Sequence, residues 1–189
     1  MTLSPRWRNL VLAIHLTISV GWIGAIAAYL SLDVAAATSH DPQTLRVSYV
    51  GMGLIVTTVI VPFAIGSLLT GVIISLGTKW GLIRHWWVTI SLVLTLIATA
   101  VLLIETGTVA AYAAVAADPA TSADELRSLG STLVHSIGGA LVLLGVLVLN
   151  VYKPSGMTRY GWRKQQEQRA ARLDEAAQVR PSSTRHGAE

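Results

Sequence analysis

The sequence of 189 residues contains no cysteine and few charges. The absence of cysteine excludes disulfides, thiolate metal sites and cysteine nucleophiles. Charged residues make up only 13% of the chain, about half the fraction found in soluble domains, which argues against a soluble globular protein. The sequence also lacks a GxGxxG motif, a Walker sequence, an HExxH motif and a nucleophile elbow. No motif therefore predicts a hydrolase or another enzyme.

The chain instead contains four long apolar runs. A transmembrane helix needs about 20 mostly apolar residues, and each run reaches that length. The segments between the runs are short, so neighbouring helices are expected to be antiparallel. Residues 1–152 are therefore predicted to form an all-α fold, a four-helix transmembrane bundle with antiparallel up-down topology. The predicted helices cover about residues 9–38, 45–77, 86–117 and 126–152.

Three of these runs clearly exceed the length needed to cross a bilayer. Their surplus is rich in alanine, as at residues 35–37 and 110–114. We expect these helices to tilt or to project one to two turns beyond the outer leaflet. Pro62 lies inside the second run and predicts a kink there.

Lysine and arginine are distributed unevenly between the two ends of the predicted helices. Of 14 such residues, only Arg46 and Arg127 lie on the side of the first and third connections; the others lie near the termini or in the second connection. Because basic loops stay in the cytoplasm, both termini are predicted to be cytoplasmic. The net charge of +4 is then explained by topology, and the expected partner is the lipid bilayer rather than nucleic acid.

Residues 153–189 form a polar, basic tail. The segment 162–179 is predicted to be helical, and the residues from Arg180 onward are predicted to be disordered. The basic side chains of this cytoplasmic tail either enforce the topology or contact anionic lipid.

One face of the first predicted helix carries polar and amphipathic side chains at spacings of three and four residues. An ionisable residue inside a membrane span is costly, so His15 is a functional hypothesis. The alternative is that the face serves packing, with His15 bonded to a serine or a carbonyl group. The residues of this face are His15, Ser19, Trp22, Ile26, Tyr29 and Asp33.

The fourth predicted helix has a comparable face that includes His135. Gly138 and Gly139 follow, and such small residues let helices approach or admit a flat ligand. Glu105 lies about 30 Å along the third helix from its start, at a depth that matches His135. The two side chains are predicted either to pair or to leave Glu105 solvated. The other residues of this face are Ser128, Ser131, Val142, Gly145 and Leu149.

Two segments resemble known membrane proteins. The spacing His15-x6-Trp22-x-Gly24 resembles the copper-resistance D type of bacterial membrane protein and the HemJ type of protoporphyrinogen oxidase. The segment 77–87 is similar to the second loop of small four-helix bacterial integral membrane proteins without an assigned function. The resemblance implies a multi-pass protein of the bacterial plasma membrane. From the HemJ type it implies haem b bound through His15.

The specific functional hypothesis is a haem-b-binding membrane protein in electron transfer or redox sensing. His15 and His85 would be axial ligands, Trp22 would line the pocket, and Lys79 or Arg84 would pair with the propionates. An alternative is a non-enzymatic structural or partner subunit of a membrane complex, or a homo-oligomer, with structural histidines. Metal-ion passage ranks last, because the chain lacks the cysteine ligands that Cu(I) prefers and has only three methionines.

Overall fold

The computed structural model describes residues 4–78 and 81–179 of the chain. These residues form helices and no named strand, which confirms the predicted all-α class. Four helical segments are long and apolar enough to cross a membrane, and the chain is an integral membrane protein. They are α1 (Pro5–Thr38), the continuous segment Pro42–Gly77, α4 (Trp86–Ala117) and α6 (Leu133–Tyr152).

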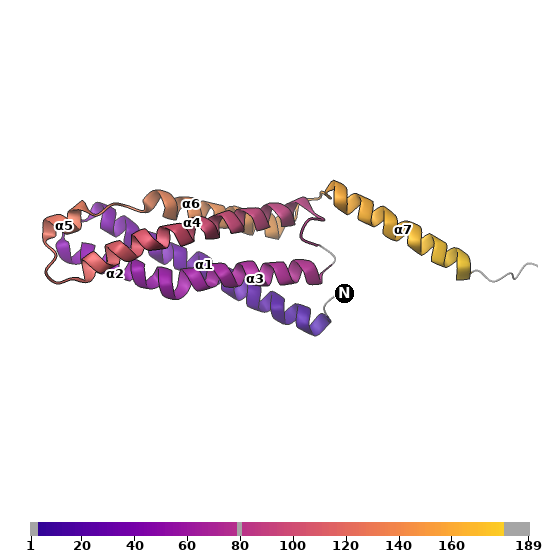
Figure 1. The fold of residues 1–189 in the computed structure, drawn as a ribbon, viewed down its shortest axis with the longest axis horizontal. Coiled ribbons are helices and arrows are strands. Elements are labelled where there is room, and N and C mark those ends of the chain that lie inside the picture. The colour runs from indigo at the N-terminus through magenta and orange to yellow at the C-terminus, as the bar shows by residue number, and fades with distance from the viewer. Residues whose placement is uncertain (1–3, 79–80, 180–189) are drawn as a thin grey trace, which may run out of the picture.

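The four spans form an antiparallel bundle (Figure 1). The first span packs against the second span and against α6. The span α4 also packs against the second span and against α6. The up-down topology predicted from the short connections is therefore confirmed. The bundle has two ends: the end near the N-terminus is called here the termini end, and the end covered by the short helix α5 (Ala123–Ser128) is called the α5 end.

The second span contains a π-helical turn rather than a simple kink. It consists of α2 (Pro42–Ile55), the turn η1 (Val56–Ile60) and α3 (Val61–Gly77). Pro62 is the second residue of α3 and lacks the N–H that a regular helix would use, so a wider turn just before it is expected. Before it, the Thr58 hydroxyl donates to the carbonyl of Leu54 at 2.7 Å.

The start of α2 is fixed by a capping aspartate outside the membrane spans. The carboxylate of Asp41 accepts from the backbone N–H of Thr44 at 2.9 Å and from the Thr44 hydroxyl at 2.7 Å. These bonds stabilise the charged form and hold the pKa of Asp41 below its ordinary value.

The prediction of one fourth helix over residues 126–152 was wrong at its start. The chain forms α5, breaks, and begins α6 only at Leu133. The break is stabilised by the Tyr49 hydroxyl, which donates to the carbonyls of Leu129 at 3.4 Å and Gly130 at 3.2 Å. Ser128 and Ser131 consequently do not belong to the helix that carries His135.

The helix of the tail is α7 (Arg159–Val179), which begins three residues earlier than predicted. It is tied to the segment before α4, because the Thr158 hydroxyl donates to the carbonyl of Ile83 at 2.6 Å. Gly161 lies so close to the Arg84 carbonyl that an added Cβ atom would clash with its oxygen. The residues from Arg180 onward, predicted to be disordered, lie outside the described residues.

Candidate functional site

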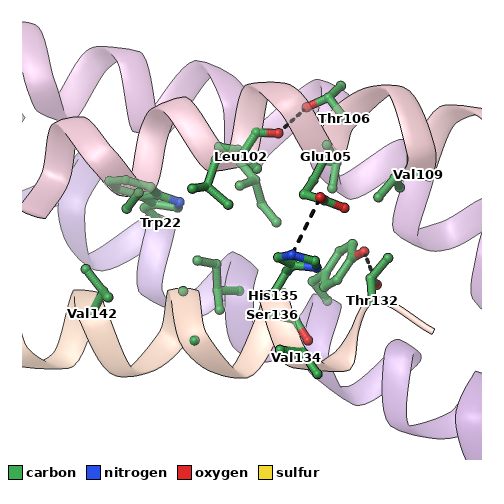
Figure 2. Close-up of a pocket in the computed structure, with 18 of the residues that line it drawn as sticks. Trp22, Leu102, Glu105, Thr106, Val109, Thr132, Val134, His135, Ser136 and Val142 are labelled. Atoms are coloured by element: carbon green, nitrogen blue, oxygen red, sulfur yellow. Dashed lines mark hydrogen bonds and ion pairs between the residues drawn. The ribbon is translucent and has the colours of Figure 1, made fainter.

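A cavity of about 250 Å³ lies between α1, η1, α4 and α6 (Figure 2). Its wall is almost entirely apolar, and the polar side chains gather at particular points of it. Apolar cavities with a few convergent polar groups are the usual form of small-molecule sites. The apolar wall includes Ile26, Ile60, Leu102, Val109 and Val142.

Trp22 supplies a hydrogen-bond donor at one end of the cavity. Its side chain comes from α1 and lies at the same end as Val142 (Figure 2). The residue is 3% exposed, and its Nε1 has no hydrogen-bond partner among the residues that the structure describes. Buried polar groups are nearly always paired, so this indole N–H is a candidate contact for a bound ligand.

Glu105 and His135 meet at the other end of the cavity. Nε2 of His135 on α6 lies 3.6 Å from Oε1 of Glu105 on α4 (Figure 2). The Glu105 side chain is 24% exposed and that of His135 is 52% exposed. The long distance leaves each side chain able to hydrogen-bond another molecule.

Two adjacent glycines of α6 open the wall of the cavity. A Cβ atom at Gly138 or Gly139 would meet no atom within 4 Å, and both residues line the cavity. The space beside them is therefore not used for close helix packing.

A buried carboxylate fixes the start of α6 beside this cavity. Asp33 is 1% exposed and accepts from the hydroxyls of Thr132 at 2.9 Å and Ser136 at 2.8 Å. Since the Thr132 hydroxyl donates to Asp33, its oxygen accepts from the Tyr29 hydroxyl at 2.7 Å. This network positions the helical turn that carries His135. Sequence reasoning placed Asp33 and Tyr29 on the inward face but did not find their partners.

His15 lies outside the cavity, against α3. Its Nδ1 is 2.8 Å from the Thr70 hydroxyl oxygen, and that hydroxyl donates to the Gly66 carbonyl at 2.7 Å. In the tautomer protonated at Nδ1, the imidazole donates to this oxygen and Nε2 keeps its lone pair. This is the arrangement of a histidine whose second nitrogen can bind a metal.

The other residues predicted to hold haem lie apart from His15. His85 directly precedes α4 and forms a backbone bridge with Met157. Arg84 donates from Nη2 to Oε1 of Gln168 at 3.3 Å, and Lys79 lies outside the described residues. The structure thus brings Trp22, Glu105 and His135 to one cavity, and leaves His15 and His85 at separate places.

Metal passage finds no built site in the described part of the chain, which holds no cluster of three histidine or acidic side chains able to bind a metal ion. Comparison with known protein families, with curated proteins and with solved structures finds no match. The function is therefore inferred from the arrangement of the chain's own residues.

Proposed function

We propose that this integral membrane protein binds a hydrophobic, ring-containing small molecule in the cavity between α1, α4 and α6. The observation that carries the proposal is the unpaired, buried Nε1 of Trp22 in an otherwise apolar wall. A ligand that accepts this hydrogen bond would remove the cost of the unsatisfied donor, which is about 1–3 kcal/mol.

The volume of the cavity restricts the size of the ligand. A dry cavity of about 150 Å³ holds a benzene molecule, so about 250 Å³ suits a group of one or two rings. A tetrapyrrole is far larger. The Gly138–Gly139 pair favours a flat shape.

A matched pair of glycine variants tests this proposal. An added Cβ meets no atom within 4 Å at Gly139 or at Gly145, and only Gly139 lines the cavity. Leucine at Gly139 should therefore take up space in the cavity, and leucine at Gly145 should add the same bulk to α6 away from the cavity wall. The protein in lipid nanodiscs is titrated with 1-aminonaphthalene, a fluorescent two-ring amine. We expect saturable binding by the wild type and by Gly145→Leu, and its loss in Gly139→Leu. Equal binding by both variants, or only linear partitioning into lipid, would contradict the proposal.

Binding of haem b at His15 is a second candidate function. A haem there would serve electron transfer or redox sensing. The observation in its favour is the contact of Nδ1 with the Thr70 hydroxyl, because the tautomer that donates from Nδ1 presents the lone pair of Nε2 to a metal. The neighbouring cavity is too small for haem, so Trp22, which lines that cavity, would not line the haem pocket. Purified protein should then show a Soret band that His15→Ala abolishes, whereas colourless protein that takes up no haem would end this candidate.

We also propose that both termini face the cytoplasm. The two basic residues at the α5 end have local roles: Arg46 donates to the carbonyls of Ala116 and Thr121, and Arg127 to that of His40. They therefore do not weaken the topology signal of the other basic residues. Single cysteines replace the exposed residues Ala120 and Ser155 in this cysteine-free chain. In intact cells only Ala120→Cys should react with an impermeant maleimide; labelling of Ser155→Cys would reverse the orientation.

If the cavity binds nothing and no haem is found, the partner-subunit hypothesis becomes the basis for further work. Its histidines and the Asp33 network would then serve packing alone. Co-purification of a second membrane protein, or of a homo-oligomer, would be the measurement to make.

A further inference from the structure

We infer that the ligand of this cavity is the ring of a lipid-soluble para-quinone, which enters from the bilayer between α4 and α6. This inference rests on the proposed function, since it names the chemical class that the same cavity takes. It follows from the chemistry of the two polar ends, their separation, and the position of the opening.

The end at Trp22 requires an acceptor. An indole N–H can only donate, so the atom that satisfies Nε1 must be an oxygen or nitrogen with a lone pair. A carbonyl oxygen fits this requirement, and an ammonium group does not. The other end is less restrictive, because His135 can donate and Glu105 can accept.

The length of α6 between the two ends is comparable to a quinone ring with a hydrogen bond at each end. Val142, at the Trp22 end, lies seven residues beyond His135 on α6, which is about 10 Å along the helix axis. The two carbonyl oxygens of a para-quinone are about 5 Å apart, given ordinary bond lengths. One hydrogen bond of about 2.9 Å at each end gives a total of about 11 Å. The wall between the ends is apolar, as Ile26 and Leu102 show, and suits a ring.

The opening of the cavity faces lipid. Three apolar side chains of its wall, Ile97, Val101 and Val134, are 55%, 40% and 82% exposed. They belong to α4 and α6, so the cavity opens on the surface between these helices. Since α6 has 20 residues, about 30 Å, it matches the thickness of the hydrocarbon core. A ligand with an apolar tail could therefore place its ring in the cavity and leave its tail among the lipid chains.

The experiment compares two probes with the same tail. Decylubiquinone carries two ring carbonyls and decylbenzene carries none, and each competes with 1-aminonaphthalene for the full-length protein in nanodiscs. We expect decylubiquinone to compete at a concentration about tenfold lower than decylbenzene. Trp22→Phe should weaken decylubiquinone about fivefold to tenfold and leave decylbenzene nearly unchanged, because one hydrogen bond is lost. His135→Leu should weaken decylubiquinone in the same selective way.

The control variant is Trp86→Phe, because Trp86 is an exposed tryptophan at the start of α4, away from the cavity. It should leave both affinities unchanged. Equal competition by the two probes, or an unchanged decylubiquinone affinity in Trp22→Phe, would overturn the quinone assignment. The cavity would still be a binding site if 1-aminonaphthalene binds and Gly139→Leu removes that binding. If 1-aminonaphthalene does not bind to the wild type, both the proposed function and the quinone assignment fail.

Discussion

The α5 end of the bundle and the part that runs beside α6 are packed differently. Of the five largest side chains with almost no exposure, four lie at the α5 end: Leu45, Met52, Leu126 and Asp33. Beside α6, by contrast, many large apolar side chains point outward, such as Leu141 at 64% exposed and Ile104 at 75%. The α5 end resembles a soluble core, and the rest resembles a surface made for lipid.

The difference follows from the surroundings of each part. α1 has 34 residues and α4 has 32, whereas α6, with 20, is alone about as long as the hydrocarbon core is thick. This surplus of 12 residues or more fits helices that tilt, or that project beyond the membrane at the α5 end, and the extent of the projection stays a prediction. In water the hydrophobic effect rewards a buried core, and in lipid it does not. The cavity lies where the two kinds of packing meet, and open space there is less costly.

The largest contrast is expected from two identical substitutions. Leu126→Ala removes a side chain that is 1% exposed at the α5 end, and Leu141→Ala removes one that faces lipid. We expect the first to lower the free energy of unfolding by about 2–5 kcal/mol and the second by less than about 1 kcal/mol. Steric trapping in lipid bicelles measures both. Similar losses at the two positions would contradict the comparison.

Glycine substitutions should show the same contrast at a smaller scale. An added Cβ at Gly53 would lie 2.5 Å from the Cβ of Ala113, where α2 and α4 pack at the α5 end. At Gly107 on α4 it would meet no atom within 4 Å. Gly53→Ala should therefore cost about 1–3 kcal/mol, and Gly107→Ala should be neutral or stabilise by up to about 1 kcal/mol. A destabilised Gly107→Ala would show that the open surface is in fact occupied.

The pair at the boundary between the two parts should couple weakly. Because His135 is half exposed and 3.6 Å from Glu105, a double-mutant cycle with Glu105→Gln and His135→Gln should give a coupling energy of about 0.3–1 kcal/mol. The free energy of unfolding of the four proteins supplies the cycle. No coupling would mean that solvent or lipid separates the two groups.

The smallest effect is expected at Asp41, which caps α2 at the α5 end. Its lowered pKa in the folded protein means that the charged cap stabilises the helix start above the ordinary pKa of aspartate. This contribution is lost as the pH falls through the lowered folded pKa. The backbone amides in the first turn of α2 should therefore be better protected from hydrogen exchange in the wild type than in Asp41→Ala at neutral pH. This difference between the two proteins should disappear in acid. An equal pH response in both proteins would exclude the cap as the cause.

The sequence predicted the number of the spans because long apolar runs are an unambiguous signal, and it predicted their antiparallel arrangement from the short connections. It did not predict the break between Leu129 and Thr132, since Leu129 and Leu133 continue the apolar pattern and the contact that stabilises the break comes from Tyr49, some 80 positions earlier. The inward face of the first helix was predicted correctly for Trp22, Tyr29 and Asp33, which are buried.

The cavity itself was not predictable in the same way. Glu105 and His135 were matched in depth from helix lengths, but the volume between them depends on how three helices diverge. The unpaired Nε1 of Trp22 depends on which side chains reach it, and spacing along one helix does not contain that information. The family resemblance and the haem ligand at His15 stay predictions.

The π-helical turn at residues 56–60 also determines how this chain tolerates insertions and deletions. Buried side chains follow one another at intervals of four through Met52, Val56, Ile60 and Ala64, a period that a regular helix of 3.6 residues per turn would carry around its axis. The wider turn holds one residue more than a regular turn, so it keeps these side chains on one face. A regular helix through all of these residues would rotate α3 by about 100° relative to α2 and take Thr70 away from His15. Removing one residue from the turn would instead restore a regular helix with α3 close to its present orientation. Among functional relatives, a one-residue alignment gap should therefore be tolerated better in this turn than elsewhere in the spans.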